Sequence, residues 1–168
     1  LIVIGTSLLL LPVSRGPAAA IDESLLDRVR VALFTATSAS CVTGLVVVPT
    51  GGATPYWSRT GQTIVLLLFQ VGGLGIMTWG AFFAIATGRQ LQIRESAALR
   101  DVMESTGLRE VRKLLLTIVA FTIVCEIVGA VMLSGLWSHL PAEEQVFQSL
   151  FHSVSAFCNA GFSLRENS

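Results

Sequence analysis

The chain has 168 residues, of which 52% are hydrophobic and 13% are charged, and its formal net charge is zero. Soluble domains carry about 25% charged residues. The composition therefore argues against an ordinary soluble domain, and a mean hydropathy of +0.71 favours segments embedded in a lipid bilayer. A balanced charge without a basic stripe also excludes the usual surface for binding nucleic acid. The cysteines are odd in number and none lies in a CxxC motif, so neither a disulfide framework nor a zinc site is predicted.

The first thirteen residues are almost entirely apolar and predict part of a membrane-spanning helix. No basic region precedes them and the chain begins at Leu1, so we interpret them as the end of a transmembrane helix and not as a signal peptide. The chain is therefore expected to be a piece of a longer polypeptide.

Two stretches, 24–39 and 142–157, predict helices too short to cross a bilayer. Each has about 15 residues, which corresponds to about 22 Å. Both begin with a helix-start signature, formed by Asp22, Glu23 and Ser24 in the first and by Pro141, Glu143 and Glu144 in the second. Each ends in small polar residues and glycine. This pattern is typical of re-entrant half-helices, whose non-helical ends are tolerated only inside protein or beside a water-filled cavity.

Two other stretches are long enough to span a membrane, from about Thr63 to Thr87 and from about Leu114 to Trp137. The first contains no charged residue. Its GGLG run, residues 72–75, predicts close packing between helices and lacks the context of a phosphate-binding loop. The second span carries one charge, Glu126, near its middle.

The connection 88–113 lies between these two spans and holds six of the eleven basic residues, namely Arg89, Arg94, Arg100, Arg109, Arg112 and Lys113. The positive-inside rule therefore places this connection in the cytoplasm. Its apolar residues also predict a short amphipathic helix there.

An internal repeat relates the two half-helices. FTATSASCVTGL (Phe34 to Leu45) aligns without a gap on FHSVSAFCNAGF (Phe151 to Phe162), at an offset of 117 residues. Identical pairs include Cys41 with Cys158 and Gly44 with Gly161. The repeated unit is a helix, a half-helix, a loop containing glycine and a second helix. Ion-selective pores use such loops, because backbone carbonyls replace the water shell of a dehydrated cation and the negative end of the half-helix favours a cation.

Three sequence segments carry a specific resemblance: SASCVTGL, the following GQTIVLLLFQVGGLGIMT, and FHSVSAFCNAGFSL. They resemble the Trk/Ktr/HKT superfamily of potassium transporters, most closely the Ktr-type membrane subunit, over nearly the whole chain. The resemblance implies an all-α membrane protein built of helix–pore helix–filter loop–helix repeats. Residues 1–87 would form the first repeat with its first helix truncated, 88–113 the cytoplasmic connection, and 114–168 the second repeat as far as its filter loop.

The resemblance also implies the site and its partners. The ion filter would be formed by the backbone carbonyls of Cys41, Val42, Thr43, Gly44, Cys158, Asn159, Ala160 and Gly161. The transported ion would be K⁺, with Na⁺ as the other possibility, and no metal site or cofactor is expected. The expected partners are two further repeats of the same polypeptide, a second copy in a homodimer, a cytosolic nucleotide-binding regulatory subunit and the lipid bilayer of the plasma membrane.

Several side chains admit two interpretations. Cys41, Cys158 and His152 could form a metal or nucleophile site, or the cysteines could be small packing residues. Glu126 could be a carboxylate on the ion pathway, or it could make a packing hydrogen bond to a residue such as Gln70, because ionisable residues in membranes are usually paired or functional.

Two other functions fit parts of the pattern. A subunit of a tetrameric potassium channel is disfavoured because the two filter segments differ and neither has a double glycine. An intramembrane enzyme using cysteine and histidine lacks a base and an orienting acid at suitable spacing.

Overall fold

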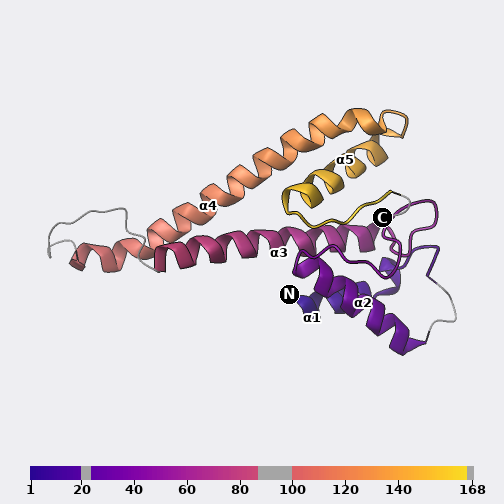
Figure 1. The fold of residues 1–168 in the computed structure, drawn as a ribbon, viewed down its shortest axis with the longest axis horizontal. Coiled ribbons are helices and arrows are strands. Elements are labelled where there is room, and N and C mark those ends of the chain that lie inside the picture. The colour runs from indigo at the N-terminus through magenta and orange to yellow at the C-terminus, as the bar shows by residue number, and fades with distance from the viewer. Residues whose placement is uncertain (20–23, 87–99, 166–168) are drawn as a thin grey trace.

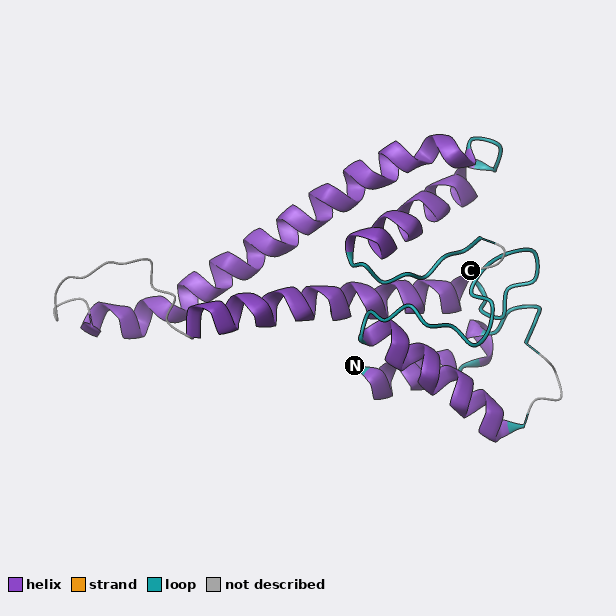
Figure 2. Cartoon of the chain, in the orientation of Figure 1, coloured by secondary structure: helices purple, strands orange, loops and turns teal. Residues whose placement is uncertain are grey.

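The computed structural model describes residues 1–19, 24–86 and 100–165, and these residues fold almost entirely as helices and loops. The five α-helices are α1 (Ile2–Leu9), α2 (Leu25–Ser40), α3 (Arg59–Ala86), α4 (Arg100–Leu133) and α5 (Ala142–Phe157). Two 3₁₀ turns, η1 (Pro12–Ser14) and η3 (Ser134–Trp137), follow α1 and α4. Figure 2 shows these helices joined by long loops at one end of the molecule.

The helices form a compact end and a long arm (Figure 1). Helices α3 and α4 run antiparallel and extend together away from the other helices. The short helices α1, α2 and α5 gather around the first half of α3, and α5 folds back against α4. The loops that follow α2 and α5 lie together at this compact end, although about 117 residues separate them in sequence.

The two half-helices predicted from sequence have the same length, 16 residues each, and occupy equivalent positions of the repeat. Helix α2 begins at the N-cap Ser24, whose hydroxyl accepts a hydrogen bond from the Asp27 amide. Helix α5 begins after Pro141 and has Glu143 and Glu144 in its first turn, where negative charge complements the helix dipole.

The predicted spans are both helical. The segment Leu115–Trp137 is, within the described residues, the one stretch that is long and apolar enough to cross a membrane, and few of its residues are buried in the protein. Helix α3 covers the predicted span from Thr63 almost to its end, and its membrane crossing stays a prediction.

The predicted start of the second span, at about Leu114, does not coincide with the end of a helix. Helix α4 begins at Arg100 and continues through Leu114 without interruption for 34 residues. A change from charged to apolar side chains alters the surroundings that a helix prefers but leaves its backbone hydrogen bonds intact. Residues 100–113 of the connection 88–113 are helical as the start of α4, residues 87–99 lie outside the described part, and the amphipathic character expected there stays a prediction.

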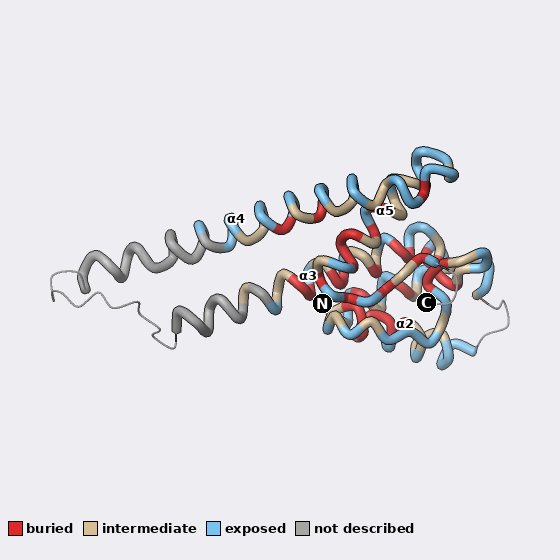
Figure 3. Tube along the Cα trace, turned by 45° about the horizontal axis from the view of Figure 1, so that its top comes forward, coloured by how far each residue is buried: buried red, intermediate tan, exposed pale blue. Residues whose placement is uncertain are grey.

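The core lies at the compact end, where Figure 3 shows the buried residues concentrated in α2, α5, the first half of α3 and the loops. Its centre is Phe69 of α3, which packs edge-on against Phe151 at 5.5 Å between ring centroids and stacks on Phe162 at 5.9 Å. All three rings are buried to 98% or more. This cluster joins α3 to α5 and to the loop that follows α5.

Candidate functional site

The turns that end α2 and α5 share one hydrogen-bonding pattern. In the first, the Thr43 amide donates to the Ser38 carbonyl at 2.9 Å and the Val42 amide to the Ala39 carbonyl at 3.1 Å. In the second, the Ala160 amide donates to Ser155 at 2.7 Å and the Asn159 amide to Ala156 at 3.1 Å. These are the two bonds of a Schellman motif, which closes a helix by turning the chain through a left-handed residue.

The backbone dihedral angles also match between the two turns. Val42 has a φ of 57° and Asn159 a φ of 56°, while Gly44 has 73° and Gly161 has 74°. Asparagine and glycine tolerate positive φ, whereas a β-branched valine does so only under strain. Val42 is therefore held in an unfavourable conformation by its surroundings.

The structure brings the two glycines into contact with each other. A Cβ atom added to Gly161 would lie 3.4 Å from the Cα of Gly44, and one added to Gly44 would lie 3.0 Å from the Cα of Gly161 and would collide with the Ala160 carbonyl oxygen. The two predicted filter segments, residues 41–44 (the first segment) and 158–161 (the second segment), thus lie side by side with their glycines in contact.

Two adjacent glycines of α3 lie against the ends of the two half-helices. A Cβ on Gly72 would collide with the carbonyl oxygen of Ser40, the last residue of α2. A Cβ on Gly73 would lie 2.8 Å from the Sγ atom of Cys158, which caps α5. The close packing predicted for the GGLG run therefore occurs against the ends of the two half-helices, a location that the sequence did not reveal.

The second segment is held by side chains of its own half-helix. The Ser155 hydroxyl donates to the Phe162 carbonyl at 2.7 Å. The Leu164 amide donates to Nε2 of His152 at 3.2 Å, and its carbonyl accepts from the Gly52 amide of the first repeat at 3.0 Å. The first segment has a different arrangement, because the hydroxyl of Thr43 donates to Oγ of Ser38 at 3.0 Å.

The other predicted site residues differ in burial and in their contacts. Cys41 is exposed, whereas Cys158 is buried and its Sγ lies 3.8 Å from Oε1 of Gln70. Glu126 is only 6% exposed and its carboxyl faces the Gln70 amide. One of its carboxyl oxygens has no hydrogen-bond partner within the described ranges, and its backbone carbonyl accepts from the Ser153 hydroxyl at 2.7 Å.

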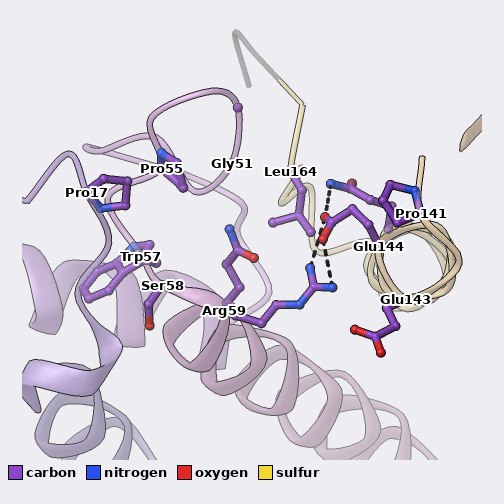
Figure 4. Close-up of a pocket in the computed structure, with 13 residues that line it drawn as sticks. Pro17, Gly51, Pro55, Trp57, Ser58, Arg59, Pro141, Glu143, Glu144 and Leu164 are labelled. Carbon is purple, nitrogen blue, oxygen red and sulfur yellow. Dashed lines mark hydrogen bonds and ion pairs between the residues drawn. The ribbon is translucent and has the colours of Figure 1, made fainter. Parts of the chain in front are cut away.

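A cavity of about 610 Å³ lies where α3 and α5 begin, between the loops that follow the first segment and the start of α5 (Figure 4). Arg59 forms an ion pair with Glu144 at 3.1 Å and lies 3.4 Å above the centre of the Phe147 ring. This contact joins residues 85 apart in sequence. No local pattern could have identified it, because charge at a helix start normally indicates only solvent exposure.

Comparison with known proteins gives a consistent assignment. The model of the TrkH family, described as a cation transport protein, matches residues 6–168. Ktr system potassium uptake protein B of Vibrio alginolyticus is 41% identical over 138 residues, which cover 82% of this chain and 30% of that protein.

Two further relatives agree with this match. Ktr system potassium uptake protein B of Bacillus subtilis is 38% identical over 165 residues, covering 97% of this chain and 34% of that protein. The potassium/sodium uptake protein NtpJ of Enterococcus hirae is 36% identical over 134 residues, covering 79% of this chain and 29% of that protein. The chain spans about a third of the length of these curated relatives.

Proposed function

Since this chain belongs to the TrkH family of cation transport proteins, we propose that it supplies two of the four filter segments of a potassium-uptake pore. The observation that carries the proposal is the pair of turns with equal dihedral angles whose glycines, Gly44 and Gly161, lie in contact. A Schellman turn is common at helix ends, but these two turns also share a positive φ at the glycine two residues later, and their glycines lie in contact. The uptake named for the three relatives supports K⁺ as the ion, with Na⁺ as the alternative.

The proposed mechanism uses backbone atoms and no covalent chemistry. The carbonyls of Cys41 to Gly44 and of Cys158 to Gly161 would replace part of the water shell of the cation. Positive φ at alternate positions allows the backbone to turn its carbonyls to one side. The C-terminal ends of α2 and α5, each with roughly half a negative charge, would stabilise the cation at the same place.

We assign the parts of the chain accordingly. Residues 1–87 would form one helix–pore helix–filter loop–helix repeat, and residues 114–168 the next repeat as far as its filter loop. The basic connection 88–113 would face the cytoplasm and the parent would lie in the plasma membrane. Two more repeats of the same polypeptide would complete the ring of carbonyls.

The proposed partners follow from the Ktr-like sequence. A second copy would form a homodimer, and a cytosolic nucleotide-binding subunit would dock on the cytoplasmic side. The described part of the chain is accordingly the permeation unit, and regulation by nucleotides would belong to the other subunit.

Growth of a potassium-uptake-deficient cell tests the proposed function. Expression of the full-length parent is expected to restore growth at low external K⁺, and uptake of K⁺ into these cells is expected to exceed that of Na⁺. A parent that reaches the membrane but restores neither growth nor K⁺ uptake would contradict the proposal. The variant Gly135→Ala is the control for glycine substitutions and is expected to restore growth, because no described atom beyond its chain neighbours lies within 4 Å of the added methyl group.

Glu126 gives a second test, which concerns its role behind the filter. We propose that its carboxyl is a packing partner of Gln70, since it is buried beside that amide, which also contacts Cys158. Glu126→Gln is then expected to keep K⁺ uptake within about twofold, while Glu126→Leu lowers stability by about 1–3 kcal/mol because the NH₂ group of Gln70 loses its carboxyl acceptor. Thermal unfolding of the purified parent and K⁺ uptake measure both effects. A carboxylate on the ion pathway would instead lose most uptake in Glu126→Gln.

A further inference from the structure

His152 occupies a bridging position between α5 and the second filter segment. Its Nδ1 lies 2.7 Å from the Gln148 carbonyl oxygen, one turn earlier in α5. Its Nε2 lies 3.2 Å from both the Leu164 amide and the Ser163 hydroxyl, which follow the segment. The ring stacks on Trp137 at 4.9 Å between centroids.

These partners determine where the proton of the neutral ring lies. A backbone carbonyl can only accept a hydrogen bond, so Nδ1 must carry the proton that is donated to Gln148. A backbone amide can only donate, so Nε2 must be the unprotonated acceptor for Leu164. Only the neutral tautomer with its proton on Nδ1 satisfies both bonds.

Protonation of the ring would break this arrangement. Both nitrogens of an imidazolium are donors, so Nε2–H would point at the amide hydrogen of Leu164. Arg165, which follows the second filter segment, acts on the ring with a positive charge that would repel the imidazolium. The facing residues of α4 and η3, Leu133, Leu136 and Trp137, are uncharged.

Leu164 also connects the two repeats. The Leu164 carbonyl accepts from Gly52, on the chain that leaves the first segment, while its amide donates to His152. A cavity of about 410 Å³ has His152, Asn159 and Gly161 in its lining, so water can reach both the ring and the filter segment from one space.

We propose that neutral His152 is a positioning residue that holds the second filter segment in its conducting shape, and that its protonation releases the segment and lowers potassium uptake. The proposal rests on the proposed filter function of Gly161. The residue equivalent to His152 in the first repeat is Thr35. Protonation of His152 would therefore act on one of the four proposed filter segments.

The test is K⁺ and Na⁺ uptake by the full-length parent at external pH values of about 7.5 and about 4.5, because burial lowers the pKa of the His152 ring below that of an ordinary histidine. Wild-type K⁺ uptake is expected to fall roughly two- to tenfold at the lower pH, the effect of losing one buried hydrogen bond. His152→Gln can still accept from Leu164 and cannot be protonated, so it should keep uptake at the higher pH and lose the pH dependence. His152→Phe keeps the stacking on Trp137 without either nitrogen, and should show the low uptake and raised Na⁺/K⁺ ratio at both pH values.

His139→Gln is the matched control, because His139 is the other histidine of the chain and is exposed, and it should retain the wild-type pH profile. Wild-type uptake that does not change between the two pH values, or a pH dependence that persists in His152→Gln, would overturn the proposal while leaving the filter function intact. A wild-type parent that takes up no K⁺ at either pH would instead overturn the proposed function, and the role of His152 with it.

Discussion

Gly44→Ala is expected to lower the ratio of K⁺ to Na⁺ uptake by about tenfold or more, and Gly161→Ala by less. Both glycines have φ near +73°, where any other residue is strained by about 1–3 kcal/mol. Gly44 has an additional restriction, because its new methyl group would collide with the Ala160 carbonyl oxygen. The methyl group of Gly161→Ala would meet only the Gly44 Cα, at an ordinary contact distance of 3.4 Å.

Gly44 and Gly161 have the same backbone conformation but different neighbours, so the two variants are expected to differ. The Ala160 carbonyl is one of the proposed filter ligands, so Gly44→Ala displaces an oxygen of the neighbouring repeat as well as its own segment. Uptake ratios for both variants, measured beside Gly135→Ala, check the order. An equal or larger effect of Gly161→Ala would contradict the contact between the two segments.

Gly72→Ala is expected to lower stability strongly. Its methyl group would collide with the backbone of Ser40, so the end of α2 and the segment after it must move. Overpacking of this kind costs about 1–3 kcal/mol. Thermal unfolding of the purified parent should show a lower Tm, and K⁺ uptake should fall with it.

Gly73→Ala offers a sharper comparison because it meets a side chain. The contact is with the Sγ atom of Cys158, so Cys158→Ala should recover part of the lost stability of Gly73→Ala and none of that of Gly72→Ala. Gly75→Ala is the matched control within the same helix, since no described atom lies within 4 Å of its methyl group. Equal losses in Gly72→Ala and Gly75→Ala would show that helix composition, and not the contact with Ser40, causes the effect.

The sequence predicted the half-helices closely because each has its own start and stop signals. The expected ranges 24–39 and 142–157 became Leu25–Ser40 and Ala142–Phe157. The positive φ of Val42 could not be predicted from valine itself, since valine disfavours it. It becomes understandable through the repeat, because the equivalent residue is Asn159, which tolerates that conformation.

Other features depend on tertiary contacts that no local pattern encodes. The ion pair of Arg59 with Glu144 joins two helix starts that are far apart in the chain. His152 was predicted as a possible reactive side chain, whereas its ring hydrogen-bonds to the backbone of Gln148 in α5 and of Leu164 after the proposed filter segment. The start of the second span expected at about Leu114 agrees with the apolar segment Leu115–Trp137, whereas the start of α4 at Arg100 could not be read from the change in composition.

The continuity of α4 gives the molecule a rigid lever. Thirty-four residues correspond to about 51 Å of helix, whereas the hydrocarbon core of a bilayer measures about 30 Å. About 20 Å of the basic end would therefore stand clear of the lipid, while the other end touches the second half-helix through the Glu126 carbonyl and Ser153. Because α4 is continuous, a force on its projecting end would be transmitted through the helix to α5, which leads into the proposed second filter segment.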